Sequence, residues 1–305
     1  MRYFWAYLQE RFPLPVNGAL ILSYFAANYL LARSVIWPGQ WLSVSWQLLA
    51  GTLALLLMFF HLRVIDEHKD YTRDRMVHPQ RLLSRGLITL AQLRRLGFLA
   101  ITVELALSLS LGWAAFVCCL TVLAGSWLIY KEFYLGEFLS NHLLLNAAVH
   151  LLLMPLYCLF VFSAATGQYP WAAPAVVLWY AWVSYGVGFA YELARKTRAP
   201  SDERAGLITY SSVIGPVASA VGMLLALIFS ALISLLVAAV LTFGLWYHVA
   251  VAGILVVVAL DVAHFRLHTT TQTAARLQVY AGLTLFAFDW LLAAELIRLH
   301  GLVWV

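Results

Sequence analysis

Long apolar runs separated by short polar connections occupy most of this chain. A helix needs about 20 mostly apolar residues to cross the hydrocarbon core of a bilayer. Nine runs have about that length, and each is continuous rather than alternating between polar and apolar positions. They cover residues 17–33, 42–62, 90–111, 114–130, 140–163, 171–190, 211–233, 243–264 and 276–299. The pattern therefore predicts nine transmembrane helices.

The divisions near Gly112 and Gly244 are the least distinct, because two runs adjoin there with almost no connection. If either division fails, the chain has eight spans. A transmembrane β-barrel would instead show alternating segments of about 10 residues. The predicted fold is thus all-α: a polytopic membrane protein, one domain over residues 1–305, with nine helices around a central cavity.

Composition and charge agree with this prediction and add an orientation. Hydrophobic residues make up 63% of the chain and charged residues 11%, whereas a soluble domain has about 25% charged residues. Of the 19 Lys and Arg residues, 17 fall on connections of one side of the predicted topology. Basic connections stay in the cytoplasm, so we expect a cytoplasmic N-terminus, an external C-terminus and a bacterial-type inner or plasma membrane. The net charge of +5 reports this orientation and predicts no nucleic-acid partner. No cleavable signal-peptide pattern precedes the first run, which is expected to be retained as a signal anchor.

Two charged segments stand out on the predicted cytoplasmic side, at residues 61–86 and 188–210. Together they hold half of the 14 acidic residues of the chain. These acids are Asp66, Glu67, Asp70, Asp74, Glu192, Asp202 and Glu203. Charged side chains next to a membrane interior are costly, so they mark candidate functional sites.

The first segment places three aspartates at four-residue intervals. Asp66, Asp70 and Asp74 would stack along one face of a helix that continues from the second span. Like charges at this spacing destabilise a helix by roughly 0.2–0.5 kcal/mol per pair, and Mg²⁺ with phosphate oxygens would offset the repulsion. The alternative is a solvated loop with local salt bridges to neighbouring basic residues, but the regular spacing at the end of a span favours a metal site.

A short echo links the two segments. Residues 86–89 read Gly-Leu-Ile-Thr, and residues 206–209 repeat this tetrapeptide in the same context, after a charged segment and before a new span. The echo favours an internal repeat of about residues 42–163 and 171–299. Such a duplication would bring the two charged segments together.

At these residues the sequence resembles the UbiA superfamily of intramembrane prenyltransferases, which carries two Asp-rich motifs at the ends of spans two and six. The first motif of that family, Asn-Asp-x-x-Asp-x-x-x-Asp, is similar to residues 66–74 of this chain, where Asp66 and Glu67 replace the first two residues. Arg81 and Gly86 match the arginine and glycine that follow, while Leu82 replaces the family's proline.

The second motif departs from the family pattern Tyr-Asp-x-x-Asp-x-x-x-Asp. Tyr191 and Glu192 match its start, but Arg195 and Ala199 occupy its two later acidic positions. The resemblance is therefore to a variant branch, in which basic residues after Glu192 grip diphosphate directly. These residues are Arg195, Lys196 and Arg198.

The resemblance implies a prenyltransferase that uses Mg²⁺ to move an isoprenyl group from an allylic prenyl diphosphate to a lipophilic acceptor in the bilayer, such as an aromatic compound or quinone precursor. It assigns catalysis to Asp66, Asp70, Asp74 and Glu192. The candidate metal ligands are Asp66, Glu67, Asp70, Asp74, Glu192, Asp202 and Glu203. The candidate substrate-binding residues are Arg63, Arg81, Lys131, Tyr191, Arg195, Lys196 and Arg198.

Aromatic rings can stabilise the allylic cation that forms when the diphosphate leaves. The candidates near the predicted cytoplasmic face are Tyr71, Tyr130, Tyr134, Tyr185, Tyr191 and Tyr210. Three acids within apolar runs, Glu104, Asp261 and Asp289, are expected to pair with interior groups such as His264 or to bind the acceptor. Two other functions stay open: a terpene cyclase on the same scaffold, and a membrane transporter, although transporters place their charged sites near the bilayer midplane.

Overall fold

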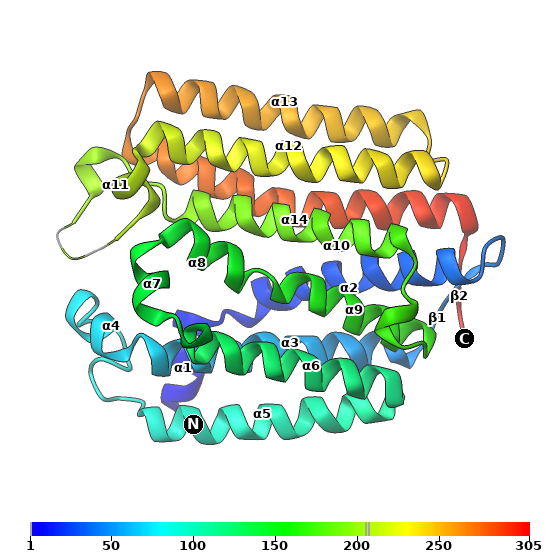
Figure 1. Cartoon of the computed structure of the whole chain (residues 1–305), viewed down its shortest axis with the longest axis horizontal. Coiled ribbons are helices and arrows are strands. Elements are labelled where there is room, and N and C mark those ends of the chain that lie inside the picture. The colour runs from blue at the N-terminus through cyan, green and yellow to red at the C-terminus, as the bar shows by residue number, and fades with distance from the viewer. Residues whose placement is uncertain (1, 205, 207) are drawn as a thin grey trace.

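The computed structural model describes residues 2–204, 206 and 208–305, and it consists of long helices that lie side by side (Figure 1). A helix or a pair of helices makes up most of each predicted span. They are α2 (Leu14–Ile36), α3 (Trp46–Lys69), α5 (Leu90–Ser110), α6 (Trp113–Tyr130), α8 (Leu143–His150) with α9 (Leu153–Thr166), α10 (Ala175–Arg195), α12 (Pro216–Val240), α13 (Leu245–Leu267) and α14 (Thr271–His300). The shorter elements are α1 (Arg2–Arg11), β1 (Leu42–Val44), α4 (Tyr71–Val77), η1 (Glu132–Tyr134), α7 (Gly136–Asn141), η2 (Pro170–Ala172), η3 (Pro200–Asp202), α11 (Tyr210–Ile214) and β2 (Leu302–Trp304).

The fold class is confirmed as all-α and membrane-spanning. Within the described part of the chain, seven helical segments are long and apolar enough to cross a bilayer. Helices α5 and α10 fall outside this set, because α5 carries three charged residues and α10 is rich in Trp and Tyr. The count of nine spans stays a prediction.

Two of the predicted spans are interrupted helices. The span at 140–163 breaks between α8 and α9, where Pro155 has no N–H for the carbonyl of Leu151. The span at 211–233 begins with the short helix α11, which ends at Gly215 with a φ of 88°. Pro216 then starts α12, a position that proline tolerates because its missing N–H would be unpaired there.

The two ends of the bundle differ in structure. Helices α4, α7 and α11 gather at one end, and the C-terminus lies at the other (Figure 1). At the C-terminal end, β1 pairs in parallel with β2, with Leu42 opposite Leu302 and Val44 opposite Trp304. The structure therefore places both charged segments at the same end of the bundle, as the charge pattern predicts.

The repeated tetrapeptide has the same local structure in both copies. Gly86 and Gly206 both have positive φ, at 71° and 83°, a conformation that costs glycine little. Thr89 and Thr209 both cap the helix that follows through a reciprocal capping box. Residue 207 lies outside the described residues. The matching turns explain the echo locally, while the larger internal repeat stays a prediction.

Close packing of α2 against α3 depends on Gly51. A Cβ atom at this position would overlap the ring of the fully buried Phe25. We expect Gly51→Ala to lower the free energy of unfolding by about 1–3 kcal/mol, because overpacking a rigid core forces neighbouring groups apart. Thermal unfolding in detergent micelles measures this change. Gly253→Ala in α13 is the matched control, since a Cβ atom there would meet nothing within 4 Å; an equal loss of stability in both variants would contradict the account.

Candidate active site

The first acidic motif lies at a junction between two helices. Helix α3 ends at Lys69, and Asp70 separates it from α4; the predicted continuous helix is therefore wrong at this point. The one-turn spacing survives, because the N–H of Asp70 donates to the carbonyl of Asp66 at 2.9 Å and the N–H of Asp74 donates to that of Asp70 at 2.8 Å.

Arginines hold two of the four acids of this motif. The Glu67 carboxylate, only 3% exposed, accepts from Nε of Arg63 at 3.1 Å and from Nε of Arg11 at 2.7 Å. Asp74 is bonded to Arg81, and Nη2 of Arg11 lies 3.6 Å from its Oδ2 atom. All of these contacts fall on one oxygen of each carboxylate, Oε1 of Glu67 and Oδ2 of Asp74, so both acids position arginine side chains.

The other two acids are more available. The nearest cation to the Asp66 carboxylate is Nη1 of Arg63, at 3.9 Å. Among the described residues, no hydrogen bond or ion pair engages the Asp70 side chain. Mg²⁺ prefers one or two carboxylates together with phosphate oxygens and water. Asp66 and Asp70 fit that donor set, whereas no group of three metal-ligating side chains occurs in the part of the chain that the structure describes.

The second charged segment is organised around Glu192 at the end of α10. This carboxylate pairs with Arg195, lies 2.9 Å from Nζ of Lys196, and accepts from the hydroxyl of Tyr210 at 3.2 Å. Burial raises the pKa of Tyr210, and the charge of Glu192 raises it further, so the phenol keeps its proton and donates. Nζ of Lys196 also lies 5.5 Å from the centre of the Tyr210 ring.

The remaining acids of this segment have other partners. Asp202 accepts from Oγ1 of Thr271 at 2.9 Å, and Glu203 accepts from Thr209 at 2.7 Å and from Ser211 at 2.6 Å. The structure therefore does not bring Asp202 or Glu203 to the Glu192 carboxylate. These contacts do not support a second metal site that includes Asp202 and Glu203, and that site stays a prediction.

The two charged segments lie at the same end of the bundle (Figure 1). Burial lowers the pKa of His78, which follows the first motif, and Arg81 and Arg198 lower it further. Two acids, Asp66 and Asp70, and two basic residues, Arg195 and Lys196, come from separate halves of the chain and lie at the same end of the bundle.

Other predicted site residues lie differently. Nζ of Lys131 lies 5.0 Å and 5.2 Å from the ring centres of Trp127 and Tyr130, on its own helix end. The backbone N–H of Arg198 donates to Oγ of Ser211 at 2.8 Å, and its Nη1 atom donates to the carbonyl of Asp202 at 3.4 Å. The structure does not bring Lys131 to either acidic motif, and it gives Arg198 contacts that hold the loop after α10.

The predicted tyrosines also divide into groups. Tyr185 donates to the carbonyl of Ala148 at 3.0 Å, Tyr71 and Tyr191 pack against the core, and Tyr130 and Tyr134 are exposed. Within the described part of the chain, Tyr210 is the one tyrosine of this set that bonds directly to a charged residue of the motifs.

Comparison with known proteins decides the family. The model of the UbiA prenyltransferase family matches residues 20–290. The chain belongs to the UbiA prenyltransferase family. No curated protein matches this UbiA chain. Its resemblance to the family at the sequence level is thereby confirmed.

Several solved structures share the fold of this UbiA protein. A digeranylgeranylglyceryl phosphate synthase is 17% identical, with a TM-score of 0.65, over 98% of this chain and 100% of that one. A UbiA homologue from Aeropyrum pernix K1 is 14% identical, with a TM-score of 0.66, over 89% and 96%. A UbiA homologue from Archaeoglobus fulgidus bound to GPP and Mg²⁺ is 13% identical, with a TM-score of 0.57, over 94% and 99%.

Sequence reasoning missed the contribution of helix α1 to the site of this UbiA protein. Arg11 reaches both Glu67 and Asp74, and Oε2 of Glu10 accepts from the N–H of Leu82 at 3.2 Å. Tyr7, fully buried, lies beside Arg63 and Glu67, and burial followed by the charge of Glu67 raises its pKa. Arg11 is separated from Glu67 by 56 positions, so no local spacing could indicate the contact.

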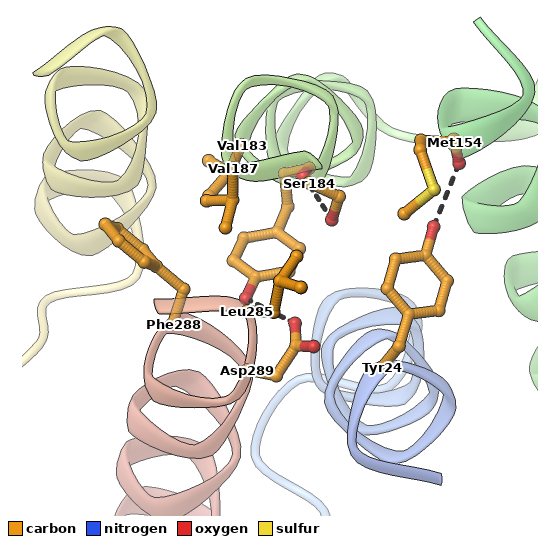
Figure 2. A pocket seen from close by; sticks show the side chains of 9 residues that line it. Tyr24, Met154, Val183, Ser184, Val187, Leu285, Phe288 and Asp289 are labelled. Atoms are coloured by element: carbon orange, nitrogen blue, oxygen red, sulfur yellow. Dashed lines mark hydrogen bonds between the residues drawn. The ribbon is translucent and has the colours of Figure 1, made fainter. Parts of the chain in front are cut away.

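The three acids inside the bundle all have partners, and none of these is His264 among the described residues. Glu104 accepts from or donates to Nδ1 of His61 at 2.9 Å, and Nε2 of that histidine lies 3.0 Å from Oγ of Ser126. Asp261 pairs with Arg276. Asp289 lines a small pocket (Figure 2) and accepts from the hydroxyl of Tyr180 at 3.0 Å. His61 thus links α3 to both α5 and α6, five residues before Asp66.

Proposed function

We propose that this UbiA protein transfers an isoprenyl group from an allylic prenyl diphosphate to a lipophilic acceptor within the membrane, with Mg²⁺ as cofactor. The observation that carries the proposal is that two available carboxylates, Asp66 and Asp70, lie at the same end of an apolar bundle as Arg195 and Lys196, the cations held by Glu192. A ligand that fits this surface carries several negative charges at one end and an apolar body at the other.

Two further findings support the proposal. The chain belongs to a family of prenyltransferases, and homologues from Archaeoglobus fulgidus that share its fold were solved with GPP and Mg²⁺ and with DMAPP and Mg²⁺. An allylic diphosphate has the charged head and apolar tail that the bundle requires.

In the proposed reaction, the bond between the allylic carbon and the diphosphate oxygen breaks, a bond forms between that carbon and the acceptor, and the acceptor loses a proton. Negative charge accumulates on the departing diphosphate, so fixed cations aimed at it lower the barrier. Asp66 and Asp70 would hold Mg²⁺, which supplies charge neutralisation when it is bound. Arg195 and Lys196 bind the diphosphate oxygens.

The ion pairs of the site keep the basic groups in place before substrate binds. Glu67 and Asp74 fix Arg63, Arg81 and Arg11, and Glu192 fixes Arg195 and Lys196. Prepositioned groups need no reorganisation when charge develops. The sorting of basic residues supports a site on the cytoplasmic face of the membrane, with the N-terminus on the same side; we assign the protein to a bacterial-type inner or plasma membrane.

The test is an assay with purified protein in lipid nanodiscs. Allylic diphosphates of several lengths are added with Mg²⁺ and candidate phenol, quinone-precursor or alcohol acceptors, and released diphosphate and prenylated products are measured. We expect Mg²⁺-dependent diphosphate release together with a prenylated acceptor. A cyclised hydrocarbon without acceptor product would indicate a terpene cyclase, and absence of diphosphate release at every chain length would overturn prenyl transfer.

A further inference from the structure

The arginines in and after the first charged segment divide into two sets. Arg63 and Arg81 pair with acids of the first motif. The members of the second set are exposed, and among the described residues no acidic side chain pairs with any of them. This exposed set consists of Arg73, Arg75, Arg85, Arg94 and Arg95. The proposed reaction gives these side chains no role, so they form a positively charged surface that needs another partner.

Two arginines of the exposed set lie on α5, which runs along one edge of the bundle (Figure 1). One face of α5 packs closely on α3, because a Cβ atom at Gly97 would come within 3.1 Å of Val64. The side chain of Glu104 also contacts His61 of α3 from this face. The buried residues of α5 recur at intervals of three or four positions, so the opposite face of the helix is left without a protein partner.

The unpartnered face of α5 combines charge with apolar surface. Arg94 and Arg95 precede Phe98 and Leu99 by four positions each, so each arginine lies one helical turn, about 5 Å, nearer the start of the helix than an apolar side chain of the same face. Phe98 is 64% exposed and Leu99 is 60% exposed. The pattern therefore places a pair of cations directly beside an exposed apolar surface.

The start of α5 is fixed at the charged end of the bundle. Thr89 caps the helix through a reciprocal capping box, and Nε2 of His68 lies 3.1 Å from the carbonyl oxygen of Leu90. This contact ties the first turn of α5 to the end of α3, next to the first acidic motif. Arginines near the end of a membrane helix extend to the lipid headgroups while the apolar residues beyond them border the acyl chains.

A phospholipid matches both parts of this surface. The guanidinium group of arginine binds phosphate oxygens through N–H donors in a planar fork, and basic residues next to a membrane surface attract anionic lipids. A free phosphate would use only Arg94 and Arg95, whereas a phospholipid also covers Phe98 and Leu99. The excess of unpaired positive charge at this end favours a lipid with a net negative charge over a zwitterionic lipid.

We propose that Arg94, Arg95, Phe98 and Leu99 form a binding site for an anionic phospholipid of the leaflet that borders the charged end of the bundle. The two guanidinium groups bind the lipid phosphate, and the two apolar side chains contact the adjoining part of an acyl chain. The other three arginines of the exposed set add positive charge without belonging to the site. The inference does not depend on the proposed prenyl transfer.

The test is a titration of the delipidated full chain in detergent micelles with phosphatidylglycerol and with phosphatidylcholine, with bound lipids counted by native mass spectrometry. We expect the wild-type protein to bind phosphatidylglycerol at least about tenfold more tightly. The double variant Arg94→Gln/Arg95→Gln should lower the affinity for phosphatidylglycerol roughly tenfold and leave the affinity for phosphatidylcholine within about threefold. The double variant Arg94→Lys/Arg95→Lys keeps both charges and should keep most of the preference.

Arg266→Gln is the matched control, because Arg266 is a single exposed arginine at the end of α13, next to the 76% exposed Leu267. Its affinity for phosphatidylglycerol should stay within about twofold of the wild-type value. An equal loss in Arg266→Gln would mean that net charge alone attracts the lipid, and it would overturn the assignment to α5. Equal binding of both lipids by the wild-type protein, or an unchanged preference in Arg94→Gln/Arg95→Gln, overturns the inference. Binding of soluble glycerol phosphate as tight as that of phosphatidylglycerol would indicate a site for free phosphate and overturns it too.

Discussion

Asp70→Asn is expected to lower the rate of diphosphate release by more than roughly 100-fold, the scale of losing a single fixed electrostatic contact in an active site. Asp66→Asn should have a similar effect. These two carboxylates share one helical turn, and the basic side chains that occupy Glu67 and Asp74 leave the pair available. The measurement is initial release of diphosphate from an allylic diphosphate at saturating Mg²⁺.

Asp202→Asn is the matched control for this prediction. Asp202 lies in the second charged segment, but its carboxylate accepts from Thr271 and ties a loop to the start of α14. We expect a rate within about threefold of the wild-type value, since a loop contact of this kind contributes only about 1 kcal/mol. A loss in Asp202→Asn as large as that in Asp70→Asn would place the metal site elsewhere than proposed.

Glu192→Gln is expected to weaken binding of the allylic diphosphate by roughly 10- to 100-fold, as with loss of other groups that orient ligands. The Glu192 carboxylate holds Arg195 and Lys196 and receives the hydroxyl of Tyr210. A neutral amide leaves both cations free to move, so ordering them when the diphosphate binds costs more free energy. Titration of the allylic diphosphate against each variant measures the change.

The dependence on Mg²⁺ distinguishes the two roles considered for Glu192. If Glu192 only positions cations, Glu192→Gln should leave the Mg²⁺ concentration for half-maximal activity unchanged. Tyr210→Phe, which removes only a hydroxyl donor from the same carboxylate, should weaken binding of the allylic diphosphate less than Glu192→Gln does. A large rise in the Mg²⁺ requirement of Glu192→Gln would instead support the predicted second metal site.

The sequence carried most of the information about the helices. The bilayer core offers no water to the backbone N–H and C=O groups. Each long apolar run therefore had to form a helix, in which these groups bond to one another. The breaks at Pro155 and at Gly215 with Pro216 were visible in the sequence as well, because these residues interrupt helical hydrogen bonding. Reading the runs for hydropathy alone hides such breaks.

Which acids bind arginine side chains and which remain available could not be predicted in the same way. The spacing of Asp66, Asp70 and Asp74 showed that carboxylates would gather, but it treated all of them as equivalent ligands. Which acid binds an arginine depends on α1, whose Arg11 arrives from a distant part of the chain. Local patterns describe one helix at a time, whereas ion pairs between helices depend on tertiary packing.

The buried acids show the same limit. Glu104 and Asp289 were recognisable as unusual because they interrupt apolar runs. Their partners, His61 and Tyr180, come from other helices, and no spacing rule joins them. The sequence could indicate that such residues needed partners but not which ones.

The central claim is that the two charged segments bind one diphosphate between them, and a double-mutant cycle tests it most directly. Binding of a non-reactive allylic thiodiphosphate is measured in the presence of Mg²⁺ for the wild-type protein, Asp70→Asn, Arg195→Gln and the double variant. Residues that act on the same ligand group give strongly non-additive effects. We expect each single variant to weaken binding. The double variant should lose little more affinity than the single variant that binds more weakly. Full additivity, or unchanged binding in Arg195→Gln, would contradict the central claim.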